Sequence, residues 1–240
     1  MKRSAVLRML FLSVFLAGVP PYGARAESDV SFLSARPIWP SGREREKNLT
    51  VGFRAVFPHP GKGIIPVLRV TGSTLYRIHL NGVFVGHGPA RGPHGFFRVD
   101  KWPLDPGSME QKNVLTVEVA GYNVNSYAYL DHPSFLRAEV VANGRVVAST
   151  AGVGNRFQAF PLPWRVQKVQ RYSFQRPFIE YWRTDPAFDG WYRDGTPPCP
   201  PVQCAVQPTS PLIPRCVALP EFRLRQPIRT VATGTVEKGP

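Results

Sequence analysis

The sequence predicts an all-β protein built as an antiparallel β-sandwich, and three observations carry this prediction. Proline makes up 26 of the 240 residues, and an interior proline costs a helix roughly 3 kcal/mol, so a helical bundle is not expected. Two Asn-Gly pairs, Asn81-Gly82 and Asn143-Gly144, lie between runs rich in β-branched and aromatic residues. No run of helix length repeats its apolar residues near every 3.6 positions, which argues against βαβ units.

The first predicted strands lead into a hairpin. Residues 49–57 (LTVGFRAVF) alternate partly between two faces and are rich in β-branched and aromatic side chains, which is typical of a strand. Residues 64–70 form a second strand, in which Pro66 indicates an edge strand or a strand start. Residues 74–80 and 83–86 flank the first Asn-Gly pair, which favours a type I′ turn because that turn needs positive φ at both central positions.

The later predicted strands repeat these patterns. Residues 114–119 (VLTVEV) alternate cleanly, with three apolar side chains on one face and Thr116 and Glu118 on the other. Residues 135–142 and 145–149 form a second hairpin around the second Asn-Gly pair. Short strands joined by proline-rich connections favour a sandwich or a barrel.

The N-terminal residues 1–26 have the three parts of a secretory signal peptide. Lys2 and Arg3 are basic, a short apolar run follows, and Ala24-Arg25-Ala26 is an A-x-A cleavage site. We therefore expect the protein to be exported to the periplasm or the extracellular space. The apolar run is too short to span a membrane, and no later run reaches about 18 apolar residues, so no membrane span is expected.

The rest of the chain divides by composition into three segments. Residues 27–150 contain the predicted strands and form the sandwich domain. Residues 151–195 are crowded with aromatic side chains and are expected to be β or irregular, with the rings serving as core or interface more than as a sugar-stacking platform. Residues 196–240 are rich in proline and are predicted to be a linker or a wrapping arm.

The net charge is strongly positive, at +14 from 30 Lys and Arg against 16 Asp and Glu. The signal peptide holds four of the bases, which leaves 26 bases against 16 acids and a net charge of +10 in the remainder. The arginines are scattered singly, without the block of five or six like charges that forms a nucleic-acid-binding arm. No nucleic-acid partner is expected, and a solvated, arginine-rich surface is favoured over polyanion binding.

No motif for a cofactor, metal or nucleophile is present. His87 and His94 flank a glycine-rich stretch and are expected to be polar loop residues, and zinc lacks a fourth ligand near the cysteines. In an oxidising compartment one disulfide is permitted, and the spacing leaves its pairing open among Cys199, Cys204 and Cys216. We therefore expect no cofactor and no metal.

Glycoside hydrolysis needs two carboxylates across the scissile bond. The candidates are Asp100, Asp105, Asp131, Glu180, Asp185 and Asp189. Asp105 and Asp185 precede prolines and fit turns. The sequence singles out no pair, so no catalytic residue is predicted.

Several stretches, taken in order, resemble the N-terminal part of bacterial α-L-rhamnosidase-like glycoside hydrolases. They are residues 35–40 (ARPIWP), 48–57 (NLTVGFRAVF), 76–82 (YRIHLNG), 85–92 (VGHGPARG), 113–119 (NVLTVEV), 172–178 (YSFQRPF) and 212–215 (LIPR). The resemblance implies β-sandwich modules of the jelly-roll, galactose-binding-like kind that precede an (α/α) helical barrel. In the family the barrel carries the catalytic carboxylates, and this chain has no barrel-length helical region.

The resemblance therefore implies a non-catalytic N-terminal accessory module, a fragment or relative of a secreted α-L-rhamnosidase-like hydrolase. Its partners would be rhamnose-containing or other carbohydrate and a C-terminal catalytic domain that is missing from this chain. Two alternatives remain from the residues themselves. One is a self-sufficient small glycoside hydrolase, and the other is a basic, secreted polyanion-binding protein.

A sugar site on a sandwich is expected on the loops at one end of the strands, because loops on a rigid scaffold carry function. Arginine and asparagine donate to sugar hydroxyls, and a tyrosine face stacks on a pyranose ring. The candidates are Arg91 and His94 after the first hairpin, and Tyr122, Asn123, Asn125 and Tyr127 after the strand at 114–119. The competing interpretation is that the asparagines are turn residues and the tyrosines cover an edge.

Overall fold

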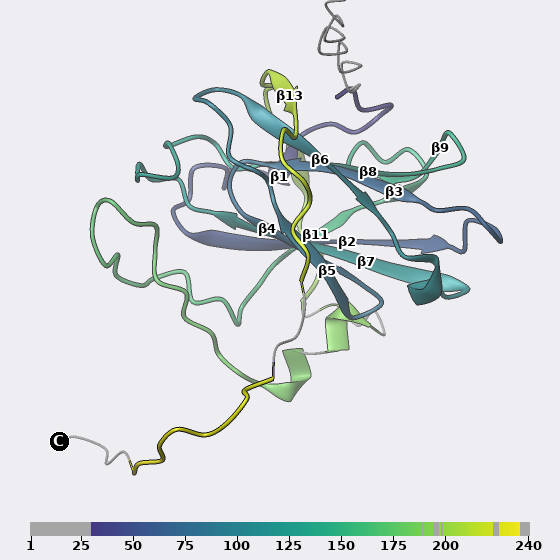
Figure 1. Ribbon diagram of the computed structural model, residues 1–240. Coiled ribbons are helices and arrows are strands. Elements are labelled where there is room, and N and C mark those ends of the chain that lie inside the picture. Colours follow the sequence, from purple (N-terminus) through teal and green to yellow (C-terminus); the bar gives the residue numbers. More distant parts are fainter. Residues whose placement is uncertain (1–29, 189, 194–196, 198, 223–225, 236–240) are drawn as a thin grey trace, which may run out of the picture.

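Two β-sheets pack face to face in the computed structural model, which describes residues 30–188, 190–193, 197, 199–222 and 226–235 (Figure 1). The predicted signal peptide, residues 1–26, lies outside the described residues. One sheet has five strands, in the order β11 (Gln158–Pro161), β2 (Leu49–Pro58), β7 (Lys112–Gly121), β4 (Tyr76–Leu80) and β5 (Val83–Gly88). All its pairs are antiparallel.

The second sheet has eight strands. Its main path runs through β10 (Asn155–Arg156), β9 (Arg145–Ser149), β8 (Leu136–Ala142), β3 (Val67–Gly72), β6 (Phe97–Pro103) and β13 (Leu212–Pro214). Beside this path β1 (Ile38–Pro40) pairs with β8 and with β12 (Cys204–Val206). Only the edge pairs β10–β9 and β13–β6 are parallel among the described strands. The predicted all-β, antiparallel sandwich is confirmed.

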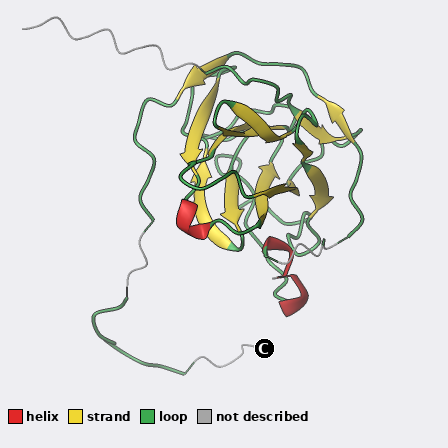
Figure 2. Cartoon of the chain, turned by 90° about the vertical axis from the view of Figure 1, so that its right-hand side faces the viewer, coloured by secondary structure: helices red, strands yellow, loops and turns green. Residues whose placement is uncertain are grey.

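The remaining regular structure consists of short 3-10 turns: η1 (Pro106–Ser108), η2 (Pro186–Phe188) and η3 (Gly190–Tyr192) (Figure 2). Within the described part of the chain, no helix has the length and apolar character needed to cross a membrane.

Both predicted Asn-Gly hairpins are present, as β4–β5 and β8–β9. Asn81 and Gly82 have φ of 50° and 82°, and Asn143 and Gly144 have φ of 47° and 72°. Positive φ at both central positions defines the type I′ turn, whose twist matches that of the flanking strands. Local chemistry is thus sufficient to set these two turns.

One predicted strand is present and another strand was missed. The strand expected at 64–70 is β3, which begins directly after Pro66, so the proline marks a strand start, as one of the two interpretations had it. The strand lies between β8 and β6 and not at an edge. Strand β6 was not predicted, because Arg98, Asp100 and Lys101 hide its apolar alternation. Asp100 is nevertheless fully buried, and its partner lies far along the chain.

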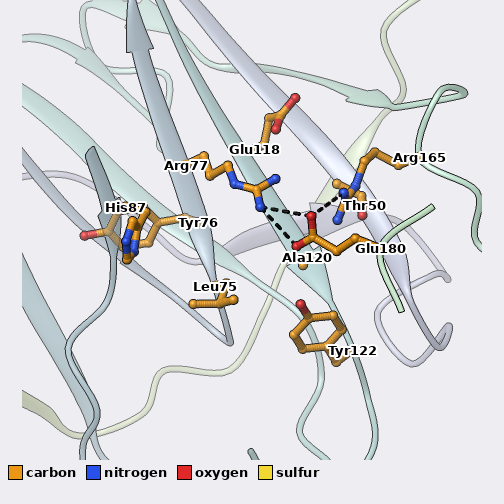
Figure 3. A pocket seen from close by; sticks show the side chains of 10 residues that line it. All are labelled: Thr50, Leu75, Tyr76, Arg77, His87, Glu118, Ala120, Tyr122, Arg165 and Glu180. Atoms are coloured by element: carbon orange, nitrogen blue, oxygen red, sulfur yellow. Dashed lines mark hydrogen bonds and ion pairs between the residues drawn. The ribbon is translucent and has the colours of Figure 1, made fainter. Parts of the chain in front are cut away.

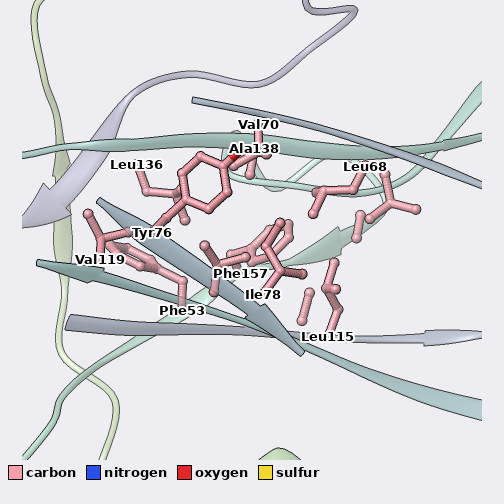
Figure 4. Packing of buried hydrophobic residues seen from close by; sticks show 14 of the residues in the cluster. Phe53, Leu68, Val70, Tyr76, Ile78, Leu115, Val119, Leu136, Ala138 and Phe157 are labelled. Carbon is pink, nitrogen blue, oxygen red and sulfur yellow. The ribbon is translucent and has the colours of Figure 1, made fainter. Parts of the chain in front are cut away.

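The core lies between the sheets and is filled by the inward side chains of both (Figure 4). Phe53, Ile78 and Leu115 from the five-stranded sheet meet Leu68 and Leu136 from the eight-stranded sheet, and all five are fully buried. Burying such a side chain stabilises the fold by roughly 1.5–3 kcal/mol. The apolar half of the alternation in β7 therefore faces inward, as the pattern predicts.

The outer face of the five-stranded sheet is covered as well, by the segment that follows β11. Thr116 and Glu118, on the polar half of β7, are buried there. The cover includes Trp164 and Trp191, which pack together. Gly52 in β2 makes this approach feasible, because a Cβ at that position would overlap the Trp191 ring.

The aromatic-rich segment, residues 151–195, divides between interior and surface. Phe157, Phe160 and Trp164 are buried. Tyr172 and Phe174, in contrast, are 82% and 76% exposed. The buried rings serve the core, and the exposed rings lie on an outer turn of the cover.

The described part of the proline-rich segment, residues 196–240, adds β12 and β13 to the eight-stranded sheet. Beyond it, residues 226–235 lie away from the sheets in both views (Figures 1 and 2). All three cysteines are free thiols, with Cys199 and Cys204 half-buried and Cys216 exposed. The structure therefore assigns no disulfide pairing.

Candidate functional site

Two cavities lie next to each other where β4 begins. The first, which we call the loop pocket, has a volume of about 350 Å³ and is formed by residues 72–74, 89–98 and 126–132. The second, which we call the charged pocket, has a volume of about 230 Å³. It lies on the outer face of the five-stranded sheet, between β2, β4 and β7 and the covering segment that carries Arg165 and Glu180.

The loop pocket brings together three of the six predicted sugar-site residues. Arg91 and His94 come from the loop after β5, and Tyr127 comes from the loop after β7. The guanidinium of Arg91 makes no hydrogen bond or ion pair with any described residue, and it is exposed. Its donors are therefore available to a ligand.

The aromatic side of the loop pocket is rigidly packed. Phe97 packs edge-on against His132 and Phe135, with ring centroids 5.0 and 4.9 Å apart. Arg98 is held by its own partners, since its Nε donates to the Arg91 carbonyl and its Nη1 to the Pro214 carbonyl, both at 2.6 Å. An apolar wall with a few free polar groups is the usual composition of a small-ligand site.

Two other predicted residues shape the loop without lining either pocket. Asn123 has φ of 46°, and its Nδ2 donates to the Glu46 carbonyl at 2.9 Å and to Ser134 Oγ at 2.8 Å. Asn125 Oδ1 accepts a hydrogen bond from the Asp131 backbone N–H at 2.8 Å. For both asparagines the structure agrees with the turn interpretation.

The sixth predicted residue, Tyr122, lines the charged pocket instead (Figure 3). It is buried, its ring packs against Tyr129 with centroids 5.4 Å apart, and burial raises the pKa of its phenol. Its hydroxyl makes no hydrogen bond with any described residue and points toward Glu180 in Figure 3. The tyrosine at the end of β7 therefore belongs to the neighbouring cavity.

The charged pocket is organised around Glu180. Its carboxylate accepts hydrogen bonds from Arg77 Nη2, at 3.0 Å to both oxygens, and from Arg165 Nη1 at 2.9 Å (Figure 3). Both guanidinium groups also lie over the Trp182 ring, at 5.6 and 4.2 Å. Burial alone would raise the pKa of Glu180, but the hydrogen bonds from Arg165 and Arg77 outweigh it and lower this pKa to about 2.

Glu118 lies on the same sheet face and has the opposite electrostatic environment. It is 4% exposed, and Tyr192 Oη donates a hydrogen bond to its Oε1 at 2.6 Å. Burial raises the pKa of Glu118, against the opposing effects of the Tyr192 hydrogen bond and of nearby Arg77. Two carboxylates in one cavity thus have pKa values displaced in opposite directions.

The sequence did not single out Arg77, Glu118 or Arg165. The alternation in β7 placed Glu118 on the face opposite the core, which was the available signal. The sequence did not indicate that the covering segment lies over this face of the sheet and encloses the cavity that Glu118 lines.

Among the other candidate carboxylates, Asp100 and Asp105 have clear structural partners. Asp100 accepts from Arg215 Nη1 at 2.9 Å and contacts the Tyr76 hydroxyl, which in turn accepts from Trp102 Nε1 at 3.0 Å. Asp105 caps η1 by accepting from the Gly107 N–H at 3.1 Å. The remaining three differ: Asp131 lines the loop pocket, the Asp185 carbonyl accepts from the Phe188 N–H, and Asp189 lies outside the described residues.

The described residues contain no group of three or more His, Cys, Asp or Glu side chains placed to hold a metal ion. Cys204 in β12 is half-buried, and burial raises the pKa of its thiol to about 11. What the two pockets do present is a set of hydrogen-bond donors and acceptors beside aromatic walls, an arrangement suited to binding a polar organic ligand.

The architecture and the pockets together define a two-sheet sandwich with two adjacent cavities where β4 begins. Among solved structures it is similar to the GH78 family rhamnosidase of Bacillus sp. GL1, with a TM-score of 0.65 and 23% sequence identity. The match covers 77% of this chain and 20% of that rhamnosidase, so this chain spans about a fifth of the longer protein. The fold implied by the sequence resemblance is confirmed.

Other comparisons add less. A lectin from Pleurotus ostreatus, solved in complex with GalNAc, matches with a TM-score of 0.32 and 15% identity over 60% of this chain and 38% of the lectin. Its apo form matches with a TM-score of 0.31 and 16% identity. At these scores the similarity does not establish a common fold. No protein-family model matches the chain, and no curated protein matches it.

Proposed function

We propose that this chain is a non-catalytic β-sandwich module of a secreted α-L-rhamnosidase-like glycoside hydrolase and that it binds carbohydrate in the loop pocket. The observation that carries the binding proposal is the convergence of Arg91, His94 and Tyr127 from two separate loops on one cavity. A free guanidinium supplies donors for sugar hydroxyls, and the aromatic wall supplies a face for the apolar side of a sugar ring.

The accessory role is supported by the fold similarity to about a fifth of a GH78 rhamnosidase. In this proposal the chemistry belongs to a separate catalytic domain, and the sandwich contributes recognition. Export through residues 1–26 is part of the same proposal and rests on the three-part signal in the sequence.

Hydrolysis by this chain alone is disfavoured by the charged pocket, which holds the two carboxylates Glu118 and Glu180. Glu180 is held by Arg77 and Arg165, and a pKa of about 2 keeps it ionised at neutral pH. A nucleophile bound in this way by two guanidinium groups is strongly stabilised in its ground state. Polyanion binding is also disfavoured, because Arg77, Arg165 and Arg215 are neutralised by carboxylates of the chain itself.

The experiment is an NMR titration of the purified, isotope-labelled protein with L-rhamnose and with D-galactose. We expect chemical-shift changes at Arg91, His94 and Tyr127. Arg91→Ala should weaken binding roughly 10- to 100-fold, because a hydrogen bond to a charged group contributes about 1.5–3 kcal/mol. Arg145→Ala, at an exposed arginine of β9 outside both pockets, is the matched control.

Absence of binding by both sugars, or shifts confined to residues 157–192, would contradict the loop pocket as the site. A parallel assay with an aryl α-L-rhamnoside should show no turnover. Turnover that is lost on Glu118→Gln would instead establish the small-hydrolase alternative.

A further inference from the structure

We propose that the loop pocket and the charged pocket are adjacent subsites of one oligosaccharide site. The inference rests on the proposed function and extends it, because it names a ligand of at least two sugar units rather than a single sugar.

The two pockets share a wall. Tyr122 lines the charged pocket, Tyr129 lines the loop pocket, and their rings are in contact with centroids 5.4 Å apart. Along the chain the division falls between Thr74, which lines the loop pocket, and Leu75, which lines the charged pocket. One layer of side chains therefore separates the cavities.

This wall is fixed by hydrogen bonds and packing. The Ala120 N–H donates to the Leu75 carbonyl at 3.0 Å, and the Thr74 hydroxyl donates to the Ala120 carbonyl. Leu75, Tyr129 and Phe178 also pack on the buried cluster around Tyr122. The spacing of the two cavities is thus preorganised, which reduces the entropic cost of binding a ligand across both.

The segments that build the two cavities are joined to each other by hydrogen bonds. The segment that supplies Arg165 and Glu180 to the charged pocket is bonded to the loop that supplies Tyr127 to the loop pocket. The Tyr127 N–H donates to the Gln175 carbonyl at 2.9 Å, and Arg171 Nη2 donates to the Asn125 carbonyl at 2.8 Å. Hydrogen bonds between these segments therefore fix the position of one pocket relative to the other.

The charged pocket has unused hydrogen-bonding capacity. Each guanidinium has five N–H donors, and Arg77 and Arg165 each use one nitrogen to hold Glu180. The Tyr122 hydroxyl has no partner among the described residues, although Tyr122 is nine-tenths buried. Alternating donors and acceptors beside a tyrosine suit the vicinal hydroxyls of a neutral sugar.

The sizes of the cavities favour a shared ligand. Sites that enclose a drug-sized molecule have volumes of about 300–1,000 Å³. The charged pocket, at about 230 Å³, is smaller than this range, and the loop pocket, at about 350 Å³, is near its lower end. The combined volume of the two pockets falls well inside the range. A sugar unit in one pocket also places the next unit at high effective concentration beside the other.

The test compares L-rhamnose with α-linked dirhamnose and trirhamnose by calorimetry and by NMR on the purified protein. We expect the disaccharide to bind at least about tenfold more tightly than the monosaccharide and to shift resonances in both pockets. Tyr122→Phe, which removes one hydroxyl and keeps the ring, should abolish most of the gain of the disaccharide over rhamnose. Tyr181→Phe, at an exposed tyrosine outside both pockets, is the matched control.

Each other outcome overturns the inference in a distinguishable way. Equal affinities for rhamnose and dirhamnose overturn it and leave the proposed function intact. A gain that persists in Tyr122→Phe but disappears in Tyr172→Ala assigns the second subsite to the exposed aromatic turn instead. If no member of the series binds, the shared site and the rhamnose-binding form of the proposed function both fail.

Discussion

Two ion-pair clusters of similar chemistry have opposite surroundings in this molecule. In the first, Asp100 is completely buried and its partner Arg215 is 14% exposed. In the second, Glu180 and Arg77 are 34% and 37% exposed and border a cavity. Both clusters join a strand of the sandwich to a residue more than 100 positions later along the chain.

The comparison shows that burial separates a structural ion pair from one that can face a ligand. If Arg215 is removed, Asp100, which is fully buried, loses its counter-ion. If Glu180 is removed, solvent in the cavity hydrates both guanidinium groups, so the cost is smaller. The first cluster therefore attaches the C-terminal segment to β6, and the second shapes a site.

The largest expected effect is that of Arg215→Ala. The substitution leaves Asp100 buried without its counter-ion and should lower the free energy of unfolding by about 3–5 kcal/mol. Urea denaturation followed by tryptophan fluorescence measures the loss. Adding Asp100→Asn to the same variant should recover part of it, because a neutral amide is less costly to bury than a carboxylate. A loss of unfolding free energy below about 1 kcal/mol would show that groups other than Arg215 stabilise the buried charge of Asp100.

A smaller effect is expected for Glu180→Gln. The pKa of Glu180 is about 2 in the fold and about 4.3 in an unfolded chain. Its stabilising contribution is therefore complete above about pH 5 and is lost as the pH falls from about 4.3 through about 2. After allowance for solvent screening, the variant should be less stable than the native protein by roughly 1–2 kcal/mol at pH 7.

The difference in unfolding free energy between native protein and Glu180→Gln, measured from pH 7 to pH 2, checks this prediction. It should shrink toward zero at the acidic end. Glu110→Gln, at an exposed glutamate that forms no ion pair with the described residues, is the control for a general loss of negative charge. A difference that stays constant down to pH 2.5 would contradict the role of the two arginines.

The smallest effect is expected for Glu118→Gln. Burial raises the pKa of Glu118, so ionising this carboxyl in the fold costs free energy. Its contribution to stability therefore declines as the pH rises from about 4.3, the pKa in an unfolded chain, through the higher pKa in the fold. The amide cannot ionise but still accepts the Tyr192 hydrogen bond. We expect stability at pH 8 to be unchanged or higher by up to about 1 kcal/mol.

Thermal unfolding at pH 5 and pH 8 measures this effect, with Tyr192→Phe as the companion variant that removes the donor. A clear destabilisation by Glu118→Gln at pH 8 would mean that the ionised carboxylate is favoured in the fold. Glu118 would then resemble Glu180, and the contrast between the two glutamates of the charged pocket would disappear.

The loop pocket was partly accessible to sequence reasoning and the charged pocket was not. Arg91, His94 and Tyr127 line one cavity because loops that leave one end of a sandwich meet there. Tyr122 was assigned to the same site, yet its side chain points to the other cavity. Nothing local in the sequence indicates that Arg165 and Glu180 return to the face of β4 and β7.

The sequence alone determined the features that depend on neighbouring residues. Positive φ at Asn81-Gly82 and Asn143-Gly144 and the two-residue alternation of β7 are local, and they were sufficient to predict two hairpins and a sandwich. The tertiary structure decided which polar residues are buried, because that depends on contacts between distant segments. Glu118 is on the polar face of its strand by sequence, and it is buried only because Trp191 and Tyr192 fold back over it. Asp100 interrupts an apolar pattern, and its place in the core depends on partners from other segments, the Tyr76 hydroxyl and Arg215, which lies 115 residues later.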